Sequence, residues 1–255
     1  MRDSTKENEL ITSVTYLLHR HKVFQSLKIS VETFLTFIAK IQSGYKDITY
    51  HNKTHAADVS TTVYYMLTTC DMWDKAAIDD IEFTAMIVGG ACHDHEHFGY
   101  NNNYLIETKD EIATRYNDVS VLENHHVAST FAILKKESYD IFINFEKADY
   151  KKMRKHMIGC ILATDMQKHF SDLGKFKSRV SSPDFDSTNG GDKELAMHLA
   201  FHLSDISNPA KRFDICRKWT ELLYVEFFIQ GDMERDKGMP ISYLMDRTTT
   251  NLAKA

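Results

Sequence analysis

Little in this sequence would interrupt α-helices. Only three prolines and ten glycines occur in 255 residues, and no stretch shows the apolar–polar alternation that is typical of a half-buried strand. Apolar residues recur with helical spacing instead, as at Val31, Phe34, Leu35, Ile38 and Ile41. The sequence therefore predicts an all-α fold, a compact bundle of many helices.

Long apolar runs and basic patches are also missing. The longest apolar run, Ala85–Cys92, is far shorter than the ~18 residues that a membrane-spanning helix needs. The formal net charge of −5 gives neither the basic footprint of a nucleic-acid-binding domain nor a polybasic membrane patch. The N-terminus is polar and charged, unlike a signal peptide. We therefore expect no nucleic-acid partner, no membrane segment and a cytoplasmic location.

Cysteine is scarce, and its spacing does not suggest pairing. No two cysteines form a CxxC pair, and they lie far apart at Cys70, Cys92, Cys160 and Cys216. Free cysteines of this kind are mostly small buried apolar residues of proteins from a reducing compartment. They agree with the expected cytoplasmic location.

The helical pattern suggests an N-terminal part and a core. Residues 1–44 are expected to be the N-terminal helical part of the domain, and residues 45–255 to form one metal-binding catalytic unit. Ser120 and Glu123 have the spacing of a capping box. Further helices are expected over Ala56–Cys70, Val121–Lys136, Lys147–Phe170 and Lys193–Ile206, and from Asn208–Pro209 to roughly Asp236, with a loop at 181–192. Asp79 and Asp80 can cap another helix, which runs to about Cys92.

Residues with metal-binding chemistry gather in three segments. In Ile87–Asn102 an apolar run leads directly into His93 and Asp94. A buried helix end is a costly place for such side chains unless a partner satisfies them, and a divalent metal would do so. The same density of His and Asp recurs in Tyr50–Val59 and His198–Asn208. The sequence predicts that the three segments converge on one metal site.

Four residues in these segments form the pattern H…HD…D: His55, His93, Asp94 and Asp205. Imidazole and carboxylate together suit Zn²⁺ and other first-row metals. A carboxylate such as Asp94 can also bridge to a second, harder ion, Mg²⁺ or Mn²⁺, which keeps most of its waters. Two such ions can clamp the attacking and leaving oxygens of a phosphoryl displacement. The pattern therefore predicts a site for two divalent ions.

Not every histidine can be a ligand, because a lone histidine is more often a surface or hydrogen-bonded core residue. His19, His21, His156 and His169 are interpreted as structural or solvated, and His95 and His198 are left out of the site. Two interpretations stay open for Asn52, Glu123 and Asn124. They either orient ligands and bound water or are ordinary polar residues of helix surfaces.

Six segments of the sequence resemble motifs of a known family, the class I 3′,5′-cyclic-nucleotide phosphodiesterases. They follow the family's order over most of the chain beyond Tyr45, and they lie at Tyr50–Val59, His93–Asn102, Val121–Ala128, Leu162–His169, His202–Lys211 and Trp219–Asp232. Tyr116–Val127 and Gly231–Pro240 are most similar to the calmodulin-stimulated branch. No calmodulin-binding helix is evident in residues 1–44, so calmodulin or a regulatory domain is a partner that the sequence does not show.

The resemblance implies an all-helical catalytic domain of the HD-type metal-dependent phosphohydrolase class. It implies hydrolysis of cyclic AMP or cyclic GMP to the 5′-monophosphate by a metal-bridged hydroxide, with Zn²⁺ at the first site and Mg²⁺ or Mn²⁺ at the second. By position, the first metal is bound by His55, His93, Asp94 and Asp205, with Asp94 also reaching the second. His51 protonates the leaving O3′. The waters of the second ion are supported by His97, Glu123 and Thr164, and the nucleotide pocket is lined by Tyr50, Met166, Ile206, Asn208 and Leu223.

One feature of the family is not found in the sequence. Its purine-reading glutamine normally follows directly after a segment like Asn251–Ala255, where this sequence ends. The expectation is a chain truncated before base recognition, in which Gln230 is no substitute because it lies inside the preceding helix. Two alternatives remain open: another HD-type phosphohydrolase, or a non-catalytic domain that binds metal or nucleotide.

Overall fold

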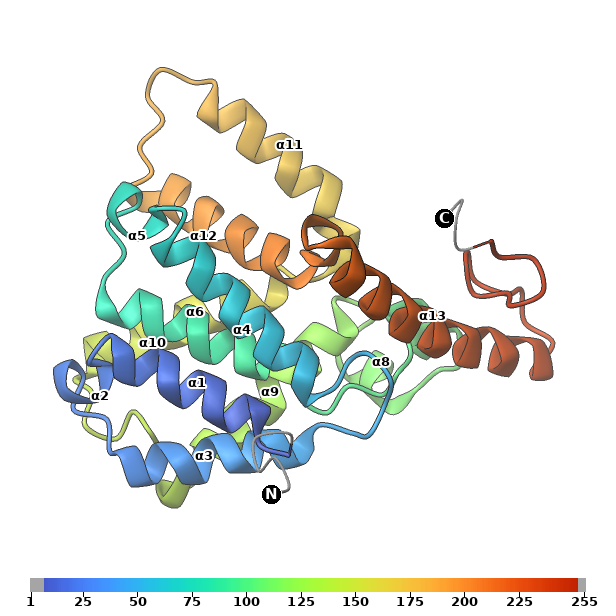
Figure 1. Cartoon of the computed structure of the whole chain (residues 1–255), viewed down its shortest axis with the longest axis horizontal. Helices are drawn as coiled ribbons and strands as arrows, with labels where there is room; N and C mark the ends of the chain where they lie inside the picture. Colours follow the sequence, from blue (N-terminus) through green and yellow to red (C-terminus); the bar gives the residue numbers. More distant parts are fainter. Residues whose placement is uncertain (1–6, 252–255) are drawn as a thin grey trace.

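Every regular element in residues 7–251, the part that the computed structural model describes, is helical, which confirms the all-α prediction (Figure 1). The α-helices are α1 (Glu9–Arg20), α2 (Val23–Ser26), α3 (Val31–Gly44), α4 (Lys53–Thr68), α5 (Met72–Lys75), α6 (Asp80–Cys92), α7 (Asn102–Glu107), α8 (Glu111–Arg115), α9 (Val121–Leu134), α10 (Lys147–Leu162), α11 (His169–Val180), α12 (Gly190–Asp205) and α13 (Phe213–Asp236). Three 3₁₀ turns are η1 (Glu137–Tyr139), η2 (Met166–Lys168) and η3 (Asn208–Ala210). Of the segment Asn251–Ala255, after which the family's glutamine would follow, only Asn251 is among the described residues.

Helix α6 forms the centre of the molecule. Asp79 and Glu82 form a capping box at its start, and every residue from Glu82 to Cys92 is buried. The helix packs chiefly against α4 and α10. Gly90 permits a close approach of α4, since a Cβ there would lie 3.0 Å from the Ser60 hydroxyl. This close packing brings the start of α4 next to the end of α6.

The N-terminal helices complete the same core. Helix α1 buries Leu10, Val14 and Leu18, and α3 buries Phe34 and Phe37. These side chains belong to one apolar cluster with residues of α4, α6, α10 and α12. The helices that surround α6 therefore fix the positions of the segments that end or begin near its C-terminus.

Helix α13 is less enclosed than α6. Its C-terminal half extends beyond the other helices in Figure 1, and of its 24 residues only five are buried.

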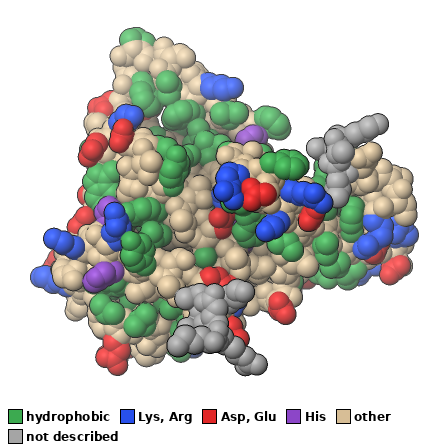
Figure 2. All heavy atoms as spheres, in the orientation of Figure 1, with side chains coloured by type: hydrophobic (Ala, Val, Ile, Leu, Met, Phe, Trp, Pro, Cys, Tyr) green, Lys and Arg blue, Asp and Glu red, His purple; other side chains and the backbone are tan. Residues whose placement is uncertain are grey.

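On the face drawn in Figure 2, acidic and basic side chains are interspersed among apolar and uncharged ones. None of the helices in residues 7–251 is long and apolar enough to cross a membrane.

Three local predictions were wrong. The helix expected over Lys147–Phe170 ends at Leu162 and is followed by η2 and α11. Ser120 precedes α9 but makes no side-chain cap, because its hydroxyl donates to Asp165. Asn208–Pro209 opens only η3, and α13 begins separately at Phe213.

Candidate metal and catalytic centre

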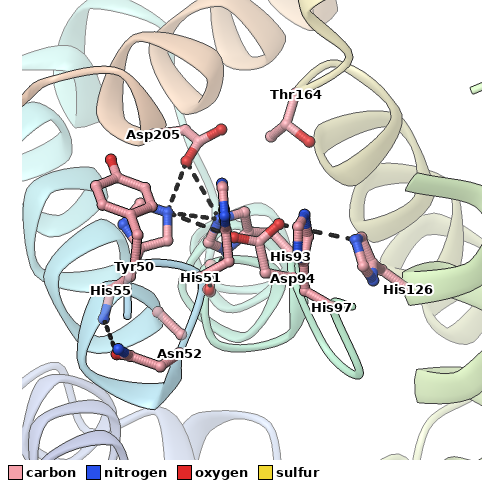
Figure 3. A network of polar contacts seen from close by, with 12 residues as sticks. Tyr50, His51, Asn52, His55, His93, Asp94, His97, His126, Thr164 and Asp205 are labelled. Carbon is pink, nitrogen blue, oxygen red and sulfur yellow. Dashed lines mark hydrogen bonds and ion pairs between the residues drawn. The ribbon is translucent and has the colours of Figure 1, made fainter. Parts of the chain in front are cut away.

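The four residues of the H…HD…D pattern meet in space. His55 lies in the first turn of α4, His93 and Asp94 follow the last turn of α6, and Asp205 is the last residue of α12. Their side chains point toward one another in Figure 3. His55 and His93 are almost fully buried, and the two carboxylates are only slightly exposed. The three segments converge as the sequence predicted.

The separations of the facing atoms are those of ligands around one ion. His55 Nε2 lies 3.0 Å from Asp205 Oδ1 and 3.4 Å from Asp94 Oδ2. His93 Nε2 lies 3.1 Å from Asp94 Oδ2 and 3.2 Å from Asp205 Oδ1, and the two Nε2 atoms are 3.3 Å apart. An ion with ligands at ~2.0–2.2 Å separates neighbouring ligand atoms by roughly 3.0–3.5 Å. The cluster could therefore hold a divalent metal.

The hydrogen bonds around the cluster leave the correct atoms free for a metal. His93 Nδ1 lies 2.8 Å from the Gly90 carbonyl oxygen, to which it donates, and this bond turns Nε2, the atom that a metal would bind, toward the cluster. Asp94 Oδ2 is buried and has no hydrogen-bond partner among the described residues. A buried carboxylate oxygen without a partner is costly, and a bound cation would remove that cost.

The charges of the cluster favour a cation as well. Burial alone would lower the pKa of the His93 imidazole and raise that of the Asp94 carboxyl. Attraction between them outweighs burial: the pKa of His93 is well above its ordinary value, and that of Asp94 is well below. The same attraction to His93 lowers the pKa of Asp205. Both carboxylates are thus ionised at neutral pH, which is their metal-binding form, whereas the His93 ring is protonated and would release its Nε2 proton on binding a metal.

His51 lies beside this cluster and is paired with Glu226 of α13. Its Nδ1 donates to Glu226 Oε1. Glu226 Oε2 accepts the backbone N–H groups of Tyr50 (2.9 Å) and His51 (3.2 Å). Burial would lower the pKa of His51, but the Glu226 hydrogen bond and the charge of Asp94 raise it. The arrangement favours an imidazolium that can donate a proton at neutral pH.

Glu226 was not predicted from the sequence. It is 4% exposed and stands in the otherwise apolar run Tyr224–Phe228. A lone carboxylate in such a run must find a buried partner, and that signal could have identified it. Its partner, 175 positions earlier in the chain, could not be named from spacing.

Three side chains form a second group of possible ligand atoms: Asp94, His97 and His126. The His97 ring stacks on His51 at 4.0 Å and on His126 at 5.7 Å. Burial lowers the pKa of His97 well below its ordinary value and that of His126 to about 3, so both rings are neutral. His126 Nδ1 donates to the His95 carbonyl at 2.7 Å, and its Nε2 faces Asp94 at 3.7 Å. The sequence motif contained His126 but gave it no role.

Glu123 and Thr164 lie in the same cavity as these histidines. The Asn102 amide donates to both Glu123 oxygens, at 3.3 and 3.0 Å. Burial raises the pKa of Glu123 to about 7. Asn52 and Asn124 have backbone roles instead: Asn52 caps α4 through Thr54 and His55, and the Asn124 amide donates to the carbonyls of Val119 and Ser120.

The cavity has a volume of about 440 Å³, within the usual range for small-molecule sites. Of the predicted pocket residues, Tyr50, Met166, Ile206 and Leu223 line it. Asn208 does not line it, and its amide donates to the Tyr50 hydroxyl at 2.5 Å. Gln230 also lines the cavity, but its side chain is fully engaged by Asn101 and Glu234.

The histidines left out of the site lie apart from the metal cluster. His95 Nδ1 bonds the Ser129 hydroxyl at 2.8 Å, and His169 Nδ1 faces His202 Nε2 at 2.8 Å. His198 lines a smaller cavity of about 290 Å³ between α11 and α12. None of the three belongs to a group of possible metal-ligand atoms within the described part of the chain.

Comparisons with known proteins agree with this geometry. The sequence model of the 3'5'-cyclic nucleotide phosphodiesterase family matches residues 50–255. The chain is 39% identical over 251 residues to a dual specificity calcium/calmodulin-dependent 3',5'-cyclic nucleotide phosphodiesterase 1B of Bos taurus, covering 98% of this chain and 46% of that protein. It is 37% identical over 257 residues to the protein of that name from Homo sapiens, covering 100% of this chain and 47% of that protein. This chain thus spans about half the length of these relatives, and it belongs to the 3'5'-cyclic nucleotide phosphodiesterase family.

Proposed function

We propose that this chain hydrolyses 3′,5′-cyclic nucleotides, cyclic AMP or cyclic GMP or both, to 5′-nucleoside monophosphates, as an enzyme of signal transduction. One observation carries the proposal: the His55–His93–Asp94–Asp205 cluster lies beside the His51–Glu226 pair at one cavity of about 440 Å³. A cation site and a proton donor on a nucleotide-sized cavity are the parts that phosphodiester hydrolysis requires.

His55, His93, Asp94 and Asp205 would hold the first ion, proposed to be Zn²⁺ because two imidazoles contribute. Asp94 would share the second, proposed to be Mg²⁺ or Mn²⁺, with waters that His97, Glu123 and Thr164 support. His126, near Asp94, joins this supporting group. When bound, such ions supply an activated water and offset the negative charge that develops on phosphate oxygens.

His51 is the proposed general acid. The attacking oxygen is that of a hydroxide, formed from a water that has released one proton to solvent. As its new P–O bond forms, the P–O3′ bond breaks and the electron pair of that bond passes to O3′. The departing O3′ is a secondary alkoxide and a poor leaving group, so it takes the proton of the His51 imidazolium. Glu226 holds the ring through Nδ1 and stabilises its charged form, which leaves Nε2–H as the donor.

The nucleotide would occupy the remainder of the cavity, against Tyr50, Met166, Ile206 and Leu223. Asn208 would act indirectly, by holding the Tyr50 hydroxyl. The relatives are named calcium/calmodulin-dependent, and regulation by calmodulin is the corresponding proposal here. The division at residues 44 and 45 and the cytoplasmic location stay predictions.

The test is turnover of both cyclic nucleotides by the zinc-loaded chain, with Mg²⁺ or Mn²⁺ added, followed by chromatography of the products. We expect 5′-monophosphate as the product. Bound metal and bound nucleotide without product would overturn the proposal in favour of a non-catalytic binding domain. Turnover of other phosphoesters alone would favour another HD-type phosphohydrolase.

A further inference from the structure

The segment Ala163–Lys168 breaks the helix that the sequence predicts. It contains Thr164 and Met166, which both line the main cavity. Thr164 is 8% exposed, and its hydroxyl donates to the Ile161 carbonyl at 2.8 Å, at the end of α10. Had α10 continued, successive side chains would turn around the helix axis, and these two would not both face the cavity. Contacts outside α10 are therefore needed to stabilise this interruption of the helix.

Asp165 makes the contacts that hold this break. It is 3% exposed. Its Oδ1 accepts the Gln167 backbone N–H at 3.0 Å, which fixes the turn that opens η2. Its Oδ2 accepts the Ser120 hydroxyl at 2.7 Å, which ties the turn to the start of α9. One buried carboxylate therefore sets both the shape of the segment and its distance from α9.

Ser120 is itself held in an unusual conformation. Its φ of 43° and ψ of 54° place it in the left-handed region, which is unfavourable for serine. Asn117 and Asp118, just before it, also have positive φ. The Lys168 ammonium donates to the Ser120 hydroxyl at 2.9 Å. Strained residues persist where their surroundings determine them, and here the surroundings are Asp165 and Lys168.

The far end of the segment is tied to another helix. His169, the first residue of α11, has Nδ1 at 2.8 Å from Nε2 of His202 in α12. Helix α12 ends three residues later with Asp205, and α9 carries Glu123 three residues after Ser120. The segment is thus fastened to both helices that deliver site residues on this side of the cavity.

We propose that Asp165, through its hydrogen bond with Ser120, is the positioning residue that holds Thr164 in the cavity that Glu123 also lines. This inference rests on the proposed function, in which these two side chains support the waters of the second ion. Asp165 also lines the cavity, but both of its carboxylate oxygens already accept hydrogen bonds, from the Gln167 N–H and the Ser120 hydroxyl, so its proposed role is positioning and not metal binding. Its loss would shift Thr164 relative to Glu123 and weaken the second metal site, while the first site, built from α4, α6 and α12, would stay intact.

The test measures Mn²⁺ binding at the second site by electron paramagnetic resonance, in protein whose first site is loaded with zinc. We expect Asp165→Asn and Ser120→Ala each to weaken Mn²⁺ binding by roughly tenfold, with zinc content unchanged. The double variant should lose little more than either single one, because both break the same hydrogen bond. The control is Asp172→Asn, the same chemical change at a surface pair with Lys175, and it should bind Mn²⁺ like the unaltered chain.

Two outcomes would overturn the proposal. Either Asp165→Asn binds Mn²⁺ with unaltered affinity and only its melting temperature falls, or zinc content falls in parallel with Mn²⁺ affinity. Because the measurement does not depend on turnover, the proposed activity can fail separately. A chain that hydrolyses neither cyclic nucleotide but loses Mn²⁺ affinity on Asp165→Asn would refute the activity and support the positioning role.

Discussion

The two ends of the main cavity are built differently. At the metal end, the candidate ligand atoms lie in or directly after three helices and are 3.0–3.4 Å apart, and all but those of Asp205 belong to buried residues. At the nucleotide end, Met166 is 57% exposed, and Ile206 and Leu223 are only partly buried. The reactive centre is thus part of the core packing around α6, whereas the surface that would meet the nucleotide belongs to segments at the edge of the core. Substitutions at the metal end should therefore change metal content or rate, whereas those at the nucleotide end should change KM.

The largest effect is expected for Asp205→Ala at the metal end. It removes one of four ligand side chains, and the remaining carboxylate leaves the site with fewer charges for a cation. We expect loss of the first metal and a rate lower by on the order of 10³-fold, since a metal contributes several kcal/mol to such a transition state. Elemental analysis and turnover are measured on the same sample. Full metal content with the rate unchanged would refute the ligand assignment.

His51→Ala should lower the rate almost as much but for another reason. Loss of a general acid costs typically 10²–10⁴-fold, and His51 is not one of the four clustered side chains. Metal content should therefore stay at the level of the unaltered chain. Equal metal loss in His51→Ala and Asp205→Ala would contradict the division of roles. A substrate with a better leaving group at O3′ should recover much of the lost rate only in His51→Ala.

Glu226→Gln should change the pH dependence more than the rate at its optimum. The acid must be protonated, so kcat/KM falls as pH rises through the pKa of His51. Burial lowers that pKa, and the Glu226 carboxylate is among the groups that raise it. Glutamine removes the charge, so the alkaline limb of the profile should move to lower pH, with the rate at pH 8 lower by roughly tenfold. An alkaline limb at the original pH would show that Glu226 only holds the Tyr50–His51 backbone.

The sequence predicted the metal end well because its signals are local. In a chain with helical periodicity throughout, an apolar run ending in His-Asp indicates the end of a buried helix, and α6 ends there with His93 as its C-cap. The other ligands follow the same logic: His55 in the first turn of α4, and Asp205 at the end of α12. The sequence thus predicted which four side chains would meet, and that they share a cation stays a prediction.

The sequence did not predict the contacts that cross the chain. Ser120 and Glu123 have capping-box spacing, yet Asp165, 45 positions away, takes the Ser120 hydroxyl, and Asn102 takes the Glu123 carboxylate. The Ser120–Asp165 hydrogen bond lies at the turn where the helix expected over Lys147–Phe170 is interrupted. Helical periodicity favours continuing a helix, whereas a buried carboxylate with two donors favours a turn. Residue spacing cannot show which of the two tendencies prevails, because one of the two donors to Asp165, the Ser120 hydroxyl, lies at the start of another helix.

The smallest effect is expected for Met166→Ala at the nucleotide end. The side chain lines the cavity but is largely exposed. Truncation removes apolar contact with a bound nucleotide, so KM should rise by roughly three- to tenfold while kcat and metal content stay the same. Met166→Leu restores apolar volume and should restore KM. A loss of kcat comparable to that of His51→Ala would mean that Met166 also fixes Thr164 through their shared turn, and the two ends of the cavity would then act as one.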